Sequence, residues 1–193
     1  MYEPRAELNK IARELLSKLD SHVQGECIHG ERVAVYAVAM GEKLDLPIED
    51  LTNVRFAAQL HDIGKLHLPA DVLTSSELSP EQTHEIRKHA EFGIKILGYD
   101  FDPLILSAVV HHHERWDGAG YPDNLAGEEI PLWSRLIAAA EVFDVLSHQV
   151  YWREPLPEPA ALEEIKSEAG KQLDPEAVDL LIQVQPLIQP LSR

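Results

Sequence analysis

Apolar residues recur every three or four positions along most of the chain, a spacing that places them on one face of an α-helix. Residues 5–20 and 31–46 both carry leucines, isoleucines or valines at this spacing. A third helix is expected from about Pro47 to Asp62, with Gly64 as its stop. No segment alternates between apolar and polar residues for long, so the pattern argues against a β-sheet.

Capping signals delimit the later helices. Ser79 precedes a proline and stands three residues before Gln82, which is typical of a helix start, and the helix that follows is expected to run to Leu97 and end at Gly98. An Asp-Pro pair at 102–103 predicts another helix, which ends in three consecutive histidines. The last three helices are expected at 131–149 and in the segments EPAALEEIKSEAG and DPEAVDLLIQV.

These elements predict an all-α chain, and its length suits one compact domain. With 193 residues, 45% of them hydrophobic, the chain can bury a sizeable core. We expect a single helical bundle, with residues 1–25 as an N-terminal helical segment and residues 26–193 as the main domain. The proline-rich residues 153–160 are interpreted as a connector between helices. The single cysteine, Cys27, excludes an internal disulfide bond and suits a reducing compartment.

The formal charge of −16 restricts the partners of the protein. So acidic a chain repels polyanions, which argues against general binding of DNA or RNA. An anionic substrate would need a local source of positive charge, and metal ions would supply it. The N-terminus is charged from its third residue and no apolar run approaches about 18 residues, so neither a secretory signal nor a membrane span is expected. We therefore expect a soluble cytoplasmic protein.

Histidines and an aspartate stand at or near the ends of the predicted helices. His61 and Asp62 are adjacent in the sequence LHDIGK, where Lys65 follows the turn at Gly64. Taken alone, a His-Asp pair is more often a surface pair at a helix end. Imidazoles from several helices can, however, converge inside a bundle, and nitrogen and oxygen ligands without thiolates suit Fe, Mn or Zn. The histidines available for such a site are His29, His89, His112 and His113 in addition to His61.

Two acidic residues interrupt the apolar helix LIAAAEVFDVL at 136–146. Glu141 and Asp144 are three residues apart and therefore lie on one side of that helix. Burying a carboxylate among Ala, Val, Phe and Leu is costly unless it is paired, and a bound metal removes this cost. The alternative is that one of the two carboxylates faces solvent at the helix edge. Solvent exposure is plausible for Asp144 alone and less plausible for both residues.

Taken in order, these motifs resemble the HD-GYP domains of the HD phosphohydrolase superfamily. The resemblance runs from about His29 to Asp179. It implies a helical bundle enclosing two or three metal ions, often iron or manganese, and hydrolysis of the bacterial second messenger cyclic di-GMP to pGpG or GMP. The segments that carry it are His29 in an H-x-x-R-V-A context, HDIGK at 61–65, His89, HHERWDGAGYP at 112–122, IPLWSRLIAAAEVFDVL at 130–146 and DPEAVDLL at 174–181.

The resemblance also implies roles for individual residues. Asp62 would bridge the ions and accept a proton, and Lys65 would stabilise the charge on the phosphoryl oxygens, while two divalent ions would activate a bridging water for in-line attack. Asp144 would support the site by orienting a ligand. The implied metal ligands are His29, His61, Asp62, His89, His112, His113 and Glu141. The expected substrate-binding residues are Arg115, Gly120, Tyr121, Pro122 and Arg153.

This chain departs from the family pattern at several positions. Glu141 stands where the family usually has Asp, and it remains a hard oxygen donor. Members with three metals carry Glu at the position of Gly25, so we expect two ions here. Val150 stands where the family has an arginine that meets the substrate phosphates, while Arg153 keeps a second basic position. The usual Lys-Pro-Gly turn is absent from TSSELSPEQ.

Three functions remain open at this stage. The preferred one is a metal-dependent phosphodiesterase acting on cyclic di-GMP. The second is a catalytically weak module that binds metal or nucleotide and regulates through protein contacts. The third is hydrolysis of a related cyclic dinucleotide. The glycine-rich loop is either part of the substrate site or a surface turn with Tyr121 packed on the bundle. A third option, implied by the resemblance, is that it is a docking surface for diguanylate cyclase domains or a separate sensor. A homodimer is a further option.

Overall fold

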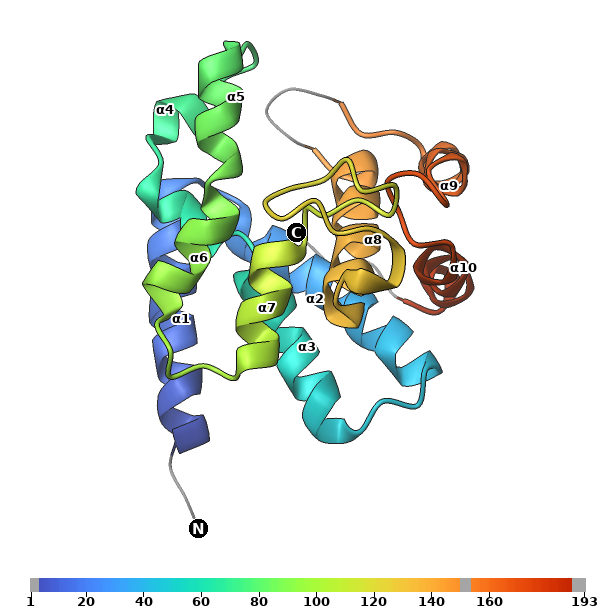
Figure 1. Ribbon diagram of the computed structural model, residues 1–193, viewed down its shortest axis with the longest axis horizontal. Coiled ribbons are helices and arrows are strands. Elements are labelled where there is room, and N and C mark those ends of the chain that lie inside the picture. The colour runs from blue at the N-terminus through green and yellow to red at the C-terminus, as the bar shows by residue number, and fades with distance from the viewer. Residues whose placement is uncertain (1–3, 150–153, 189–193) are drawn as a thin grey trace.

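The computed structural model describes residues 4–149 and 154–188, and over these ranges it consists of helices and loops without a β-strand (Figure 1). The α-helices are α1 (Pro4–His22), α2 (Glu26–Lys43), α3 (Ile48–Leu60), α4 (Ala70–Leu73), α5 (Pro80–Arg87), α6 (His89–Leu97), α7 (Pro103–His111), α8 (Leu132–Ser147), α9 (Glu158–Ser167) and α10 (Pro175–Val184). The 3₁₀ helices are η1 (Ile63–His67), η2 (Gly127–Glu129) and η3 (Gln185–Leu187). The expected all-α bundle is thereby confirmed.

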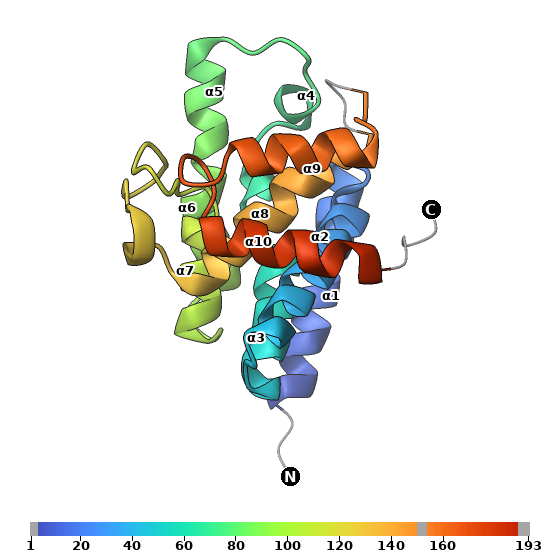
Figure 2. The ribbon, with the colours of Figure 1, turned by 90° about the vertical axis from the view of Figure 1, so that its right-hand side faces the viewer.

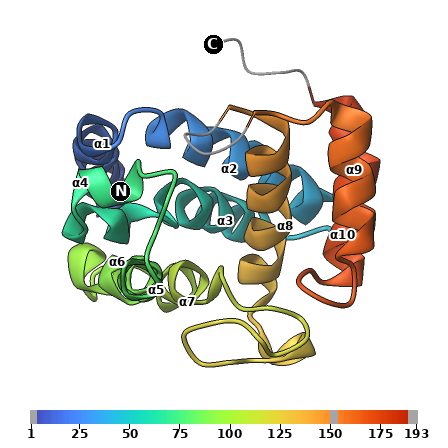
Figure 3. The same ribbon diagram turned by 90° about the horizontal axis from the view of Figure 1, so that it is seen from above.

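The helices are arranged around α2 and α3. Seen from above, α2, α3 and the pair α6–α7 lie in successive rows, and α8 crosses the ends of these rows (Figure 3). Helices α9 and α10 run side by side on the outer face of α8, as Figure 2 shows. Helix α1 packs against α2, α3 and η1 at the opposite end of the bundle. No helix within the described residues is long and apolar enough to cross a membrane.

Small residues bring the central helices close together. Ala34, Ala37 and Val33 of α2 are fully buried in the main core. A Cβ atom at Gly30 would lie 2.8 Å from the carbonyl oxygen of Gln59, so α2 and α3 touch backbone to backbone there. Such an approach leaves no room for a side chain and fixes the relative height of the two helices. This is the height at which α2 carries His29 and α3 ends at His61.

Most of the predicted helices are found, and two boundaries need correction. The helix expected from Ser79 to Leu97 is broken at Lys88, where ψ is −12° and the backbone N–H bonds Glu85, three residues back. The Ser79 cap itself is confirmed by a complete capping box with Gln82. The helix expected to reach Asp62 ends at Leu60, and after a turn the chain continues through Gly64 as η1.

Gly64 has a different role. A Cβ atom at this position would lie 1.8 Å from the carbonyl oxygen of His89 and 2.8 Å from the backbone nitrogen of Gly93. Only a glycine therefore lets η1 lie directly against the start of α6. The contact brings the segment that follows Asp62 onto the helix that begins with His89. The glycine that was interpreted from the sequence as the end of a helix is therefore needed for close packing of two backbone segments.

Candidate metal centre

The centre is built where helices end. His61 follows the last residue of α3 and Asp62 precedes η1, so both project from a junction between two helices. His89 is the first residue of α6, and His112 directly follows α7. His61 keeps helical backbone angles, whereas Asp62 departs from them, with φ −94° and ψ 7°. Adjacent His61 and Asp62 therefore reach the same interior point, which side chains 100° apart on a continuous helix face would not do.

Asp62 is shared by two groups of histidines. Its Oδ2 lies 3.2 Å from Nε2 of His61 and 3.8 Å from Nε2 of His29. Its Oδ1 lies 3.3 Å from Nε2 of His89 and 4.0 Å from Nε2 of His112. One carboxylate oxygen thus faces each group, which is the arrangement of a ligand that bridges two ions.

The seven residues predicted as ligands are brought together by the fold. They form three overlapping groups whose potential ligand atoms lie within 4.8 Å of one another. Glu141, on α8, joins His61 and His112 in the third of these groups. The groups are Asp62–His89–His112–His113, His29–His61–Asp62 and His61–His112–Glu141.

Hydrogen bonds determine which nitrogen of each ring faces the centre. Nδ1 of His61, His89 and His112 lies 2.6–2.7 Å from the carbonyl oxygen three residues earlier. A carbonyl only accepts, so each neutral ring carries its hydrogen on Nδ1 and turns an unprotonated Nε2 inward. Nε2 of His89 nevertheless lies only 3.3 Å from Nε2 of His112. Two lone pairs at this distance repel, unless a cation lies between them.

The buried polar atoms at this point also lack partners. Among the described residues, Nε2 of His61 and Oδ1 of Asp62 are buried without a hydrogen bond. An orphaned buried acceptor costs about 1–3 kcal/mol. Oxygen and nitrogen donors that converge without hydrogens are the donor set of Fe, Mn or Zn. The residues present therefore fit a metal centre.

Burial and neighbouring charges set the protonation of the ligands. Burial, reinforced by the other imidazoles, holds the pKa of His112 and of His113 well below the usual range, so both stay in the neutral form that binds metal. Burial also raises the pKa of Glu141. For His61, burial opposes protonation, but the adjacent Asp62 outweighs it and raises the pKa to about 9.

Lys65 approaches Asp62 as expected, and it has a second partner that the sequence analysis missed. Its Nζ lies 2.7 Å from Oδ2 of Asp62 and donates to both carboxylate oxygens of Glu26, each at 3.0 Å. The signal for Glu26 was present, because it stands three residues before His29 on the same helix and so shares its face. Burial by itself raises the pKa of Asp62, but the neighbouring charges, of which Lys65 has the largest effect, outweigh it and hold this pKa well below its usual range.

Asp144 is buried, so its solvent-facing interpretation is wrong. Its Oδ2 accepts a hydrogen bond from Nδ1 of His29 at 2.7 Å, which turns Nε2 of His29 toward Asp62. Arg32 donates hydrogen bonds to the same carboxylate from Nε at 2.5 Å and from Nη2 at 2.8 Å. Nδ1 of His148 lies 3.0 Å from Oδ1 of this carboxylate. Burial raises the pKa of Asp144, but the hydrogen bonds from Arg32, His148 and His29 outweigh it and lower this pKa.

The loop after α7 is anchored by a buried acid that the sequence analysis passed over. Glu114, only 3% exposed, accepts hydrogen bonds from the backbone N–H groups of Asp123 at 2.7 Å and Leu125 at 3.1 Å. Gly120 packs directly on this segment, since a Cβ there would lie 2.3 Å from the nitrogen of Arg115. Glu114 follows His113 directly, so the acid that holds the loop and the candidate ligand are neighbours in the chain.

The remaining predicted substrate-binding residues have varied surroundings. Tyr121 stacks on His113, with ring centroids 4.9 Å apart, and is joined to Pro122 by a cis peptide bond. Arg115 forms a two-point ion pair with Asp117 at 2.7 and 3.0 Å. Val150 and Arg153 lie outside the described residues, so their predicted roles are not addressed by the structure.

Two cavities adjoin the centre. A cleft of about 560 Å³ is bordered by Glu26, His29, Lys65 and Arg32 on one side and by Leu73, Leu78 and Ile86 on the other. A smaller cavity of about 260 Å³ lies behind the ligands, between His112, Glu114 and Glu141. The larger cleft combines cations, a candidate ligand and an apolar wall, as a site for a nucleotide requires.

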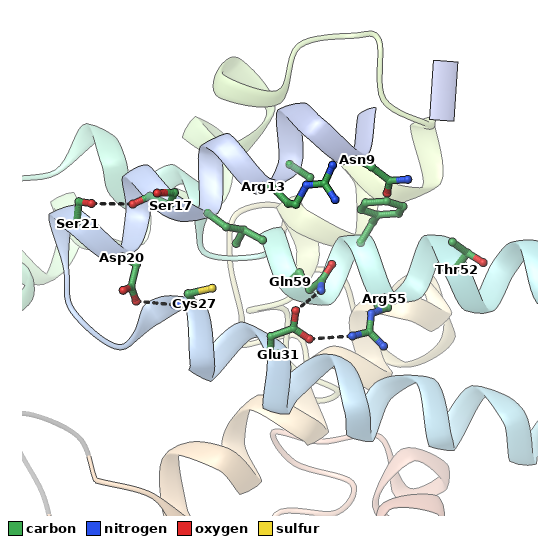
Figure 4. A pocket seen from close by; sticks show the side chains of 13 residues that line it. Asn9, Arg13, Ser17, Asp20, Ser21, Cys27, Glu31, Thr52, Arg55 and Gln59 are labelled. Atoms are coloured by element: carbon green, nitrogen blue, oxygen red, sulfur yellow. Dashed lines mark hydrogen bonds and ion pairs between the residues drawn. The ribbon is translucent and has the colours of Figure 1, made fainter. Parts of the chain in front are cut away.

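A third cavity, of about 630 Å³, lies between α1, α2 and α3 and is lined by residues outside these ligand groups (Figure 4). Some of its polar side chains are paired: Glu31 accepts from Arg55 at 2.9 Å and from Gln59 at 2.6 Å. Asp20 accepts from the backbone nitrogen of Cys27 at 3.1 Å. None of the candidate metal ligands lines this cavity.

Comparison with known proteins identifies the family. The family model described as HD domain matches residues 11–177. The chain belongs to the HD domain family. The fold of this HD domain is similar to that of a solved structure described as an HDG"Y"P protein from Bdellovibrio bacteriovorus, with a TM-score of 0.69 at 21% identity over 83% of this chain and 52% of that one.

Curated relatives carry related names. The HD domain is 33% identical to a cyclic di-GMP phosphodiesterase of Thermotoga maritima over 86% of this chain and 46% of the relative. It is 34% identical to the cyclic di-GMP phosphodiesterase response regulator RpfG of Xanthomonas campestris, over 91% and 49%. It is 30% identical to the 3'3'-cGAMP-specific phosphodiesterase 2 of Vibrio cholerae, over 92% and 35%. The chain thus spans between a third and a half of the length of these relatives.

Proposed function

We propose that this HD domain is a metal-dependent phosphodiesterase that hydrolyses cyclic di-GMP to pGpG or GMP. The observation that carries the proposal is Asp62, whose two oxygens face two separate groups of histidines, as a centre for two ions requires. The names of the relatives from Thermotoga maritima and Xanthomonas campestris support the substrate.

In this proposal the chain positions the diester and manages protons around the ions. The ions, when bound, supply a hydroxide and neutralise phosphate oxygens. Asp62 would be a ligand of both ions, one through each carboxylate oxygen, and it would accept the proton that the attacking water loses. Lys65, 2.7 Å from Asp62, offers its ammonium to the charge that develops on the phosphoryl oxygens. The proposed ligands remain His29, His61, Asp62, His89, His112, His113 and Glu141, with Asp144 orienting His29.

The metal is proposed to be iron or manganese, bound as two ions. Histidine nitrogens with two carboxylates and no thiolate are compatible with either. Arg115, Gly120, Tyr121, Pro122 and Arg153 stay proposed substrate contacts. A homodimer, docking of diguanylate cyclase domains or of a separate sensor on the loop after α7, and a cytoplasmic location also stay predictions.

A second candidate substrate is 3'3'-cGAMP. The relative whose alignment covers 92% of this chain is named for that dinucleotide. The two substrates differ in a single base, so the same centre serves the chemistry of both, and contacts to the base would decide between them.

The test is turnover by protein purified without oxygen and supplied with Fe²⁺ or Mn²⁺. We expect wild-type protein to cleave cyclic di-GMP, and we expect the double variant His61→Ala with Asp62→Ala to lose both metal and turnover, measured by elemental analysis and by chromatography of the products. 3'3'-cGAMP is assayed in parallel, and the larger kcat/KM identifies the preferred substrate.

A matched control replaces one histidine and one aspartate outside the metal centre. His84 and Asp71 are both exposed and belong to no ligand group, so His84→Ala with Asp71→Ala should behave as wild type. Hydrolysis that persists in the His61–Asp62 double variant would place the active site elsewhere. A wild-type protein that retains two ions but cleaves neither dinucleotide would reject the proposed activity in favour of a binding module.

A further inference from the structure

Most cations near the metal centre are already neutralised by a carboxylate. This matters because a phosphate is held best by a cation that has no competing anion beside it. The pairs are Arg32 with Asp144, Lys65 with Asp62 and Glu26, Lys88 with Glu85, and Arg115 with Asp117.

Arg87 differs from these cations. It is the last residue of α5, it is exposed, and no carboxylate of the described residues forms an ion pair with it. Its guanidinium carbon lies over the ring of Tyr121, 5.2 Å from the centroid. A cation–π contact of this kind holds the side chain in place without cancelling its charge.

Tyr121 connects Arg87 to the metal centre. The tyrosine ring stacks on His113 with an angle of 30° between the planes, and Nε2 of His113 lies 3.1 Å from Nε2 of His89. The residue before Arg87, Ile86, borders the cleft of about 560 Å³ that also contains His29 and Lys65. Arg87 does not itself border this cleft, but it follows Ile86 in the chain and lies over Tyr121, which contacts a candidate ligand.

The position of Arg87 suits the second phosphate of a cyclic dinucleotide. Such a dinucleotide carries two phosphodiesters, and only one of them can lie on the ions at a time. The other remains an anion against a protein with a formal charge of −16, so it needs a positive partner nearby. Arg87 and Lys95 are both described cations near α6 for which no ion pair is found, and of the two only Arg87 has an aromatic partner that stacks on a candidate ligand, His113.

We propose that Arg87 binds the phosphate of the cyclic dinucleotide that is not being cleaved. The inference rests on the proposed function, since it concerns the same substrate. Arg87 is a substrate-binding residue in this account, and Tyr121 positions it. The planar guanidinium can offer two parallel N–H groups to phosphate oxygens, which a lysine at the same place cannot do.

The test compares two substrates in metal-loaded protein. Cyclic di-GMP has two phosphates, whereas bis(p-nitrophenyl) phosphate has one and cannot use the second position. We expect Arg87→Ala to raise the KM for cyclic di-GMP because one charge-assisted contact is lost. This increase should be about 10- to 100-fold larger than any increase in the KM for the single-phosphate ester. Arg87→Lys should recover part of this difference.

Lys95→Ala is the matched control. Lys95 is an exposed cation on α6 that lies over the ring of Phe92, 4.8 Å from Nζ to the centroid, so its loss removes the same charge and the same type of contact. Arg87→Ala kinetics equal to those of this control, or an equal loss on both substrates together with a lower metal content, would overturn the inference. Failure of wild-type protein to cleave any cyclic dinucleotide would instead reject the proposed function.

Discussion

At the scale of single residues, the centre depends on which ring nitrogen each histidine turns inward. His61, His89 and His112 are all oriented by a carbonyl three residues earlier in the chain, so local backbone geometry presents Nε2 to the interior. His29 is the exception, because its Nδ1 bonds Asp144 of another helix. The orientation of this ligand therefore depends on a long-range contact, and Asp144 in turn depends on Arg32.

Replacing Asp144 by asparagine tests this dependence. The amide keeps the size of the side chain but loses the charge that holds Arg32 and the Nδ1–H of His29. Loss of such an orienting partner lowers metal affinity roughly 10- to 100-fold. Titration of metal-free protein with Mn²⁺, followed by calorimetry, measures the change. Asp179→Asn, at an exposed position of α10, is the control, and an Asp144→Asn variant with the affinity of this control would show that His29 is oriented without Asp144.

At the scale of elements, the ligands gather because helices end next to one another. The junction of α3 with η1 lies against the start of α6, and Gly64 makes this contact possible. A helix end is mobile unless it is held, so close packing here keeps His61, Asp62 and His89 at fixed separations. The loop after α7 is held in the same way, by Glu114 and by the contact of Gly120 with the backbone.

Gly64→Ala should therefore damage both stability and metal binding. The new Cβ would meet the carbonyl oxygen of His89 at 1.8 Å, a backbone atom that cannot swing aside, and we expect a loss of about 3 kcal/mol in the free energy of unfolding. Denaturation and elemental analysis measure the two effects. Gly41→Ala is the matched case, since its Cβ would meet the flexible end of Leu51 at 2.9 Å, and we expect a change within about 1 kcal/mol. Equal effects of the two changes would contradict this account of the junction.

At the scale of the whole molecule, the bundle encloses a cluster of nitrogen and oxygen atoms, two of which, Nε2 of His61 and Oδ1 of Asp62, are buried without a hydrogen-bond partner among the described residues. Repulsion among their lone pairs and the desolvated Asp62 and Glu141 weaken the metal-free fold. A cation in the centre removes both penalties and binds only the folded chain, because the ligands come from segments that unfolding separates. Metal binding and folding should therefore be coupled.

The melting temperature tests this coupling. At a Mn²⁺ concentration of about 100 Kd the folded state gains about 2.7 kcal/mol, which corresponds to roughly 5–10 °C for a chain of this size. Wild-type protein should show this rise after the metal is restored to a chelated sample, and the His61→Ala, Asp62→Ala double variant should not. A rise of equal size in both proteins would mean that the metal binds elsewhere.

Periodicity, capping and motif order in the sequence determined the helical class, most helix positions and the set of candidate ligands. Each of these features depends on neighbouring residues or on the type and order of residues along the chain. They can therefore be recognised in the sequence without knowledge of the fold. The Ser79 capping box is an example, since every atom it uses lies within four consecutive residues. The seven candidate ligands were reached through motif order, and the fold then brought them together.

The tertiary structure alone decided how those residues are supported. His29 and Asp144 are 115 positions apart, Lys65 and Glu26 are 39 apart, and neither pairing leaves a mark in the local pattern. The burial of Asp144, the anchoring of the loop by Glu114 and the position of Arg87 over Tyr121 have the same origin. Each depends on where one helix lies against another, and that is set by packing of the whole core, because side chains interdigitate in only a few ways that leave no voids.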